Sequence, residues 1–182
     1  MGNNFCKCNF LDEDESNKEE DIPKIEVARL EGHNDEISAL EIGNNMLISS
    51  SMDKTIILWN LTKYTLIKKL EGHTEGVKCL KMLKNGNLAS GGFDNTIKVW
   101  DLNKFTCIQT LTGHTGHIFA LNQLPDGRII SGASDWSIIV WNENGSQDFV
   151  LEGHEEAVYT IEVLPDGKVV SGSVDQNIKL WD

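Results

Sequence analysis

The sequence predicts an all-β protein built from four copies of one unit, because two motifs recur and helical patterns are missing. Gly-His occurs four times, at steps of 40, 41 and 40 residues: Gly32-His33, Gly72-His73, Gly113-His114 and Gly153-His154. Trp recurs at steps of 41, 41 and 40 residues: Trp59, Trp100, Trp141 and Trp181. No stretch shows helical periodicity over about ten or more residues. A fixed period of about 40 residues indicates a repeat architecture.

Each unit contains three short apolar segments that are typical of strands. The first segment follows Gly-His, at residues 37–40, 77–80, 118–121 and 158–161. In the last three units a hairpin turn comes next, at Asn85-Gly86, Asp126-Gly127 and Asp166-Gly167. These dipeptides accept the positive φ that tight hairpins require. The second segment follows this turn, and the third lies after a turn at an Asp and ends in the recurring Trp.

A fourth segment connects consecutive units, at residues 66–70, 107–111 and 149–151. One more apolar segment, residues 25–30, precedes the first Gly-His. The total of sixteen strands is the number needed for four sheets of four antiparallel strands.

Gly-His and a Trp followed by Asp or Asn at this period resemble the WD-repeat (WD40) β-propeller family, in which each repeat forms one four-stranded blade. The resemblance implies four repeats at approximately 24–60, 61–101, 102–142 and 143–182. In the family an N-terminal strand completes the last blade, a role that falls to residues 25–30. Three arrangements stay open: a small closed ring of four blades, a ring shared by two chains as a homodimer, and part of a longer propeller.

The charge and the cysteines exclude several classes of function. The net charge is −12 and no basic patch is present to neutralise phosphates, so we expect no nucleic-acid binding. Four cysteines at unrepeated positions do not indicate a disulfide scaffold, which favours a reducing, cytoplasmic location. No apolar run is long enough to span a bilayer.

Residues 1–23 form an acidic segment, with seven acidic and two basic residues, that we expect to be disordered. Gly2 is placed for N-myristoylation, and Cys6 and Cys8 are close enough for palmitoylation. Two acyl chains would tether the protein to a membrane. The usual myristoylation motif has Ser or Thr where this chain has Cys6. The alternative is a frayed terminus with two exposed thiols.

Every unit also contains Ser, His and Asp, the residue types of a hydrolytic triad. Ser always lies four residues before Asp and Trp six residues after it, and such repetition is typical of structure rather than of one asymmetric catalytic site. The resemblance implies a hydrogen-bonded chain in each blade: Trp59–Ser49–His33–Asp53, Trp100–Ser90–His73–Asp94, Trp141–Ser131–His114–Asp135 and Trp181–Ser171–His154–Asp175. We therefore expect no enzyme activity, no metal site and no cofactor, since single histidines in separate blades cannot converge on one ion.

The resemblance also implies that protein partners bind a top face whose residues lie at fixed positions after His and before Asp. In this chain the residues at these positions form an apolar, aromatic rim, and such side chains are typical anchors of protein interfaces: Met52, Phe93, His117, Phe119 and Tyr159. Trp136 is a further candidate, because its counterparts in the other repeats are polar. The alternative for Trp136 is that it covers a neighbouring loop.

The leading hypothesis for function is a non-catalytic protein-interaction scaffold, tethered to a membrane if its N-terminus is acylated. The alternative is a stoichiometric structural subunit of a larger complex, such as a ubiquitin-ligase adaptor or a cytoskeletal assembly. An enzyme is disfavoured because His117 is the only histidine outside the repeat pattern.

Overall fold

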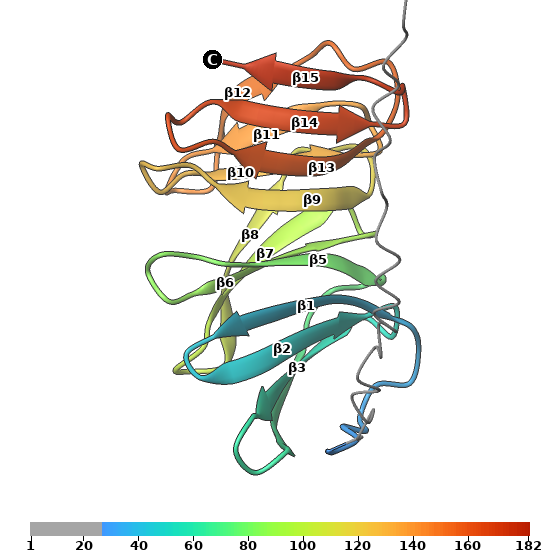
Figure 1. The fold of residues 1–182 in the computed structure, drawn as a ribbon, viewed down its shortest axis with the longest axis vertical. Coiled ribbons are helices and arrows are strands. Elements are labelled where there is room, and N and C mark those ends of the chain that lie inside the picture. The colour runs from blue at the N-terminus through green and yellow to red at the C-terminus, as the bar shows by residue number, and fades with distance from the viewer. Residues whose placement is uncertain (1–26) are drawn as a thin grey trace, which may run out of the picture.

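The computed structural model describes residues 27–182, which form fifteen strands in four antiparallel sheets that we name blades 1 to 4 (Figure 1). Blade 1 contains β1 (Ile37–Gly43), β2 (Met46–Ser51), β3 (Thr55–Asn60) and β4 (Thr65–Glu71). Blade 2 contains β5 (Val77–Met82), β6 (Leu88–Gly92), β7 (Thr96–Asp101) and β8 (Thr106–Thr112). Blade 3 contains β9 (Ile118–Gln123), β10 (Ile129–Ala133), β11 (Ile138–Trp141) and β12 (Gln147–Leu151). Blade 4 contains β13 (Val158–Val163), β14 (Val169–Ser173) and β15 (Ile178–Trp181).

The hairpin between the first two strands of each blade depends on residues that accept positive φ. Gly86, Gly127 and Gly167 have φ of 85°, 100° and 92°. Glycine adopts this region without the steric cost that a Cβ brings. Blade 1 uses Asn44 and Asn45 instead, with φ of 52° and 59°, and two central residues with positive φ are the pattern of a type I′ turn.

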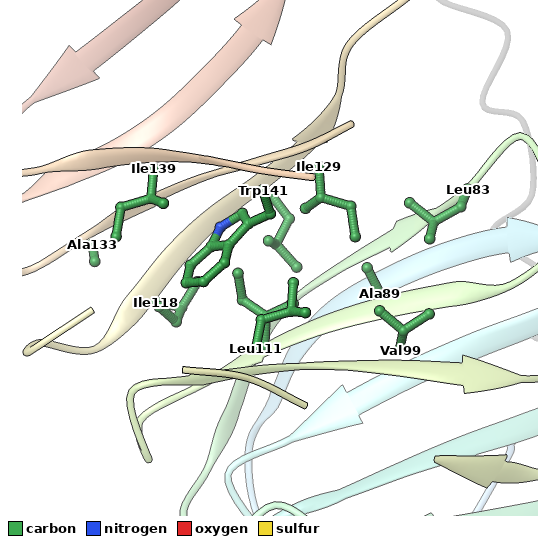
Figure 2. Packing of buried hydrophobic residues seen from close by; sticks show 11 residues of the cluster. Leu83, Ala89, Val99, Leu111, Ile118, Ile129, Ala133, Ile139 and Trp141 are labelled. Atoms are coloured by element: carbon green, nitrogen blue, oxygen red, sulfur yellow. The ribbon is translucent and has the colours of Figure 1, made fainter. Parts of the chain in front are cut away.

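The hydrophobic core lies between neighbouring blades. Three clusters of buried side chains each combine residues of two adjacent blades. Figure 2 shows the cluster between blades 2 and 3, where Trp141 lies close to Leu111, Ile118 and Ile129. Because each blade is stabilised by its neighbours, a blade face without a neighbour leaves apolar side chains in water.

The blades approach one another closely at glycines of their second strands. A Cβ added at Gly91 would lie 2.5 Å from Cγ2 of Ile118 in the next blade. At Gly132 the equivalent distance, to Cγ1 of Val158, is 2.7 Å. A larger residue at either position would therefore push the next blade away.

The four blades follow one another in an arc. The inner strands contact each other in chain order, β1 with β5, β5 with β9, and β9 with β13. Blade 1 and blade 4 lie at opposite ends of this arc in Figure 1. The prediction of an all-β protein with four antiparallel blades is confirmed.

The strand count differs from the prediction in blade 4. Of the strand expected at residues 25–30, the described part is residues 27–30, which have no strand structure. Blade 4 accordingly contains three strands, and within residues 27–182 only β14 pairs with β15. A strand needs a hydrogen-bonding edge, and the edge of β15 lies at the other end of the arc from this segment (Figure 1).

Candidate functional site

Each blade contains a chain of hydrogen bonds that begins at its Trp. The Trp lies in the third strand, and its Nε1–H donates to the Ser hydroxyl of the second strand at 2.8 Å in all four blades. The Ser Oγ lies 2.7 or 2.8 Å from Nε2 of the His that precedes the first strand. Nδ1 of that His lies 2.6–3.0 Å from a carboxylate oxygen of the Asp in the turn.

The carboxylate at the end of each chain determines which ring nitrogen carries the proton. An ionised Asp only accepts hydrogen bonds, so Nδ1–H must donate to it. Burial of Asp94 would by itself raise its pKa. Hydrogen bonds from His73, Thr74 and Thr96 outweigh burial, and the pKa is well below its usual range. The pKa values of the other three Asp residues are lowered for the same reasons, so all four are ionised at neutral pH.

These chains do not present a nucleophile to a substrate. The four Ser residues are at most 2% exposed. Each hydroxyl accepts a hydrogen bond from Trp and lies next to a His nitrogen in its own blade. A buried group whose hydrogen bonds are satisfied stabilises the fold and would cost free energy to expose. The geometry therefore supports a structural role for the sixteen residues.

Four of the predicted rim residues form one continuous group of contacting rings, which we name the aromatic stack: Phe93, His117, Phe119 and Tyr159. The ring centroids of Phe93 and His117 are 4.6 Å apart, and those of Phe119 and Tyr159 are 4.4 Å apart, both stacked. Phe93 and Phe119 meet edge to face at 6.0 Å. The aromatic stack spans three blades, because Phe93 follows β6, Phe119 lies in β9 and Tyr159 lies in β13.

Hydrogen bonds hold His117 within the aromatic stack. Its Nδ1 lies 2.7 Å from the carbonyl oxygen of Phe93, so this nitrogen donates across the boundary between blades 2 and 3. Its backbone N–H donates to Oγ of Ser134 at 2.7 Å. The sequence did not indicate this supporting role for Ser134, because a single serine in a turn carries no pattern. The Tyr159 side chain is 51% exposed.

Met52 lies apart from the aromatic stack, at the boundary between blades 1 and 2. Its Cε would be 2.7 Å from a Cβ added at Gly76, so the thioether fills the space that this glycine leaves. Met52 therefore packs between blades.

Trp136 has a position in the repeat whose role the sequence did not reveal. All four equivalents have positive φ, which is 73° for Trp136, 74° for Lys54 and 61° for Asn95. Lys54 and Asn95 reach the following blade, where they donate to the carbonyl oxygens of Thr74 and Thr115 at 2.8 and 3.4 Å.

Trp136 also faces the following blade. It lines a shallow pocket with Glu152, Gly153 and His154, so it lies beside a neighbouring loop. Its side chain is 49% exposed. No ring contact joins it to the aromatic stack within the part of the chain that the structure describes.

The predicted acylation sites Gly2, Cys6 and Cys8 and the acidic segment 1–23 lie outside the described residues. Within residues 27–182, no helix is long and apolar enough to cross a membrane. The same part of the chain contains no group of three or more side chains that could hold a metal ion.

Comparison with known proteins gives the family. The sequence model described as "WD domain, G-beta repeat" matches residues 24–60, 64–101, 105–142 and 145–182. The chain belongs to the WD40 repeat family. WD40 propellers generally serve as non-catalytic scaffolds that bind protein partners.

Several known proteins resemble this chain. A relative in Schizosaccharomyces pombe, "WD repeat-containing protein pop2", is 39% identical over 62 residues, which are 34% of this chain and 9% of that protein. The WD40 β-propeller domain of Doa1 superposes with a TM-score of 0.79 and 26% identity, over 84% of this chain and 53% of that chain. The computationally designed Ika4 protein has a TM-score of 0.76 and 33% identity, over 84% of this chain and 94% of that chain. This WD40 chain thus spans about half of the Doa1 chain and under a tenth of pop2.

Proposed function

We propose that this WD40 chain is a non-catalytic protein-interaction scaffold whose partner binds at the aromatic stack. The observation that carries the proposal is the continuous contact of four rings across three blades, with His117 and Tyr159 exposed. Aromatic side chains are enriched among the residues that dominate binding free energy. Rings that already pack against one another lose little conformational entropy when a partner binds.

The charge of the neighbouring loops defines the chemistry of the partner. The loops that follow the recurring His contain exposed acidic side chains, among them Asp35, Glu75, Glu155 and Glu156. The whole chain has a net charge of −12. Complementary charge increases association rates and selects partners. The partner we propose presents an apolar or aromatic side chain flanked by basic residues.

The same geometry argues against an active site in the repeated Ser, His and Asp residues. The serine hydroxyls are buried and the carboxylates already accept several hydrogen bonds. Detectable turnover by the isolated protein would contradict this part of the proposal.

The test compares proteins captured from cell extract by the immobilised full chain and by three single variants. Tyr159→Ala and His117→Ala shorten exposed members of the aromatic stack, and Trp136→Ala is the matched control because it removes an exposed aromatic side chain elsewhere. Quantitative mass spectrometry measures enrichment, and circular dichroism checks the fold of each variant. We expect at least one protein bound by the wild type to fall by about tenfold or more with both stack variants and to persist with Trp136→Ala. Equal capture by all four proteins, or loss with Trp136→Ala alone, would reject the aromatic stack as the site.

A second measurement tests the alternative that the protein is a fixed structural subunit of a larger complex. A scaffold exchanges partners, whereas a structural subunit co-purifies with its complex at a constant ratio.

Membrane tethering through Gly2, Cys6 and Cys8, and a cytoplasmic location, remain predictions from sequence. A myristate analogue that still labels a Gly2→Ala variant would argue against acylation at Gly2. The predicted homodimer concerns a different surface, the two end blades.

A further inference from the structure

Blades 2, 3 and 4 each present two apolar side chains of the first strand to the preceding blade. In blade 2 these are Val77 and Leu80, which are buried against blade 1. Blades 3 and 4 bury their equivalents in the same way: Ile118, Leu121, Val158 and Ile161. The equivalents in blade 1 are Ile37 and Leu40, which are 57% and 60% exposed. Blade 1 therefore has a face built to pack against a preceding blade.

Blade 4 has the opposite face uncovered. In blades 1, 2 and 3, two apolar side chains of the third strand are buried against the next blade: Ile56 and Leu58, Ile97 and Val99, Ile138 and Val140. Their equivalents in blade 4 are Ile178 and Leu180, which are 80% and 61% exposed. The uncovered faces at the two ends thus correspond to the two sides of the internal interfaces.

A strand position is open at the same end of the arc. The third strands of blades 1, 2 and 3 each pair with a fourth strand, with Ile56 opposite Leu70, Ile97 opposite Leu111, and Ile138 opposite Leu151. Each of these leucines comes two residues before the Gly-His of the next repeat. Leu30 has the same spacing from Gly32-His33, and no strand includes it. In this register Leu30 belongs opposite Ile178.

We infer that two copies of this chain associate head to tail, so that blade 4 of each copy packs against blade 1 of the other. The segment around Leu30 of one copy adds as the fourth strand beside β15 of the other. The two ends of one chain lie at opposite ends of the arc, so a second copy supplies the complementary surfaces (Figure 1). Two such contacts close an eight-bladed ring, within the range of about four to eight blades that propellers typically have.

Polar side chains agree with this pairing. At the contact between blades 1 and 2, Oε1 of Glu41 accepts a hydrogen bond from the backbone N–H of Met82 at 3.0 Å. Blade 4 has glutamate at the equivalent position, Glu162, and the residue equivalent to Met82 in blade 1 is Ile42. Oε2 of Glu162 accepts from Nδ2 of Asn122 in blade 3 at 3.1 Å, so a contact with the backbone N–H of Ile42 of the second copy would use the other oxygen, Oε1.

The test is the absolute mass of the full chain, measured by light scattering after size exclusion over a range of concentrations. We expect a sharp species of twice the 20.3 kDa chain mass. Leu40→Asp, in blade 1, and Ile178→Asp, in blade 4, should each prevent ring closure, because each places a charge at both contacts of the dimer. Ile108→Asp is the matched control, since it adds a charge at an exposed apolar residue of an internal blade and should leave the dimer unchanged.

Mixing the two variants distinguishes a head-to-tail contact from a symmetric one. Leu40→Asp retains a native blade 4 and Ile178→Asp retains a native blade 1, so the mixture can form one native contact. We expect a tagged copy of one variant to capture the other variant, although neither captures itself. Circular dichroism shows whether each variant is folded, and an unfolded variant is replaced by Leu40→Ser or Ile178→Ser. A folded monomer or a polydisperse aggregate for the wild type, a dimer that survives Ile178→Asp, or failure of the mixed variants to associate would overturn the inference.

Discussion

Replacing Asp135 by alanine is expected to destabilise the protein by about 1–3 kcal/mol. The Asp135 carboxylate accepts hydrogen bonds from His114 Nδ1 at 2.9 Å, from the Thr115 N–H at 2.7 Å, and from the Ser137 hydroxyl at 2.8 Å. Thr115 is exposed and Ser137 lies near the surface, so water can replace the lost acceptor there. The His114 side chain is fully buried, and its Nδ1–H loses its carboxylate.

The loss of stability in Asp135→Ala comes from one buried donor, the Nδ1–H of His114. An unsatisfied buried polar group costs about 1–3 kcal/mol, and the Ser137 hydroxyl, 3.2 Å from His114 Nδ1, can offset part of this cost. Asp135→Asn should cost less than Asp135→Ala, because the amide oxygen still accepts from His114 although the charge is lost. Each kcal/mol lowers the melting temperature of a domain of this size by about 2–4 °C.

The assay is thermal and denaturant unfolding of the wild type, both Asp135 variants and Glu143→Ala. Glu143 is exposed, so this control removes one negative charge without leaving a buried group unpaired. If Asp135→Ala melts no lower than the control, or if the alanine and asparagine variants are equally destabilised, the carboxylate does not hold His114 as argued.

Three further predictions concern pH, packing and thiol chemistry. The folded protein lowers the pKa of Asp135 below the unfolded value of about 3.9. The contribution of Asp135 to stability is therefore present above about pH 4 and is lost as the pH falls further. The difference in unfolding free energy between wild type and Asp135→Ala should be constant from about pH 5 to 7 and shrink below about pH 4. Gly132→Ala should lower the free energy of unfolding by about 1–3 kcal/mol, since the new Cβ would lie 2.7 Å from Val158 Cγ1. A double-mutant cycle should show a smaller loss in a Val158→Ala background, and equal losses in both backgrounds would place the strain elsewhere. Burial raises the pKa of Cys79 to about 12, so peptide mapping after brief treatment of the native protein with a thiol reagent should find Cys107 modified and Cys79 unmodified, and equal modification would show that the blades open readily.

The fold of each blade could be predicted from the sequence because its determinants are local. The Asn-Gly and Asp-Gly turns set the hairpins of blades 2, 3 and 4, and the fixed spacing of Ser131 and Trp141 brings these two side chains together within one antiparallel sheet. Hydrogen-bond register between adjacent strands follows from turn length, so a repeat of known period specifies it four times. The family followed from the same pattern.

The strand expected at residues 25–30 could not be placed from local sequence pattern. Its apolar pattern is that of a fourth strand, but pairing depends on an edge that belongs to another blade. The described residues 27–30 lie at the far end of the arc from β15, so the pattern alone could not place them (Figure 1).

Contacts between blades were decided by the tertiary structure. The sequence alone determined that Phe93, Phe119 and Tyr159 occupy rim positions of the repeat, and that Phe119 and Tyr159 occupy the same position. Only the packing of blades 2, 3 and 4 brings the rings of Phe93 and Phe119 to 6.0 Å and those of Phe119 and Tyr159 to 4.4 Å. The same packing places Trp136 beside the loop of the next blade and Met52 between two blades. The physical reason is that repeat spacing specifies pairing within a sheet, whereas the angle between sheets depends on how side chains of different volume fill the space between them.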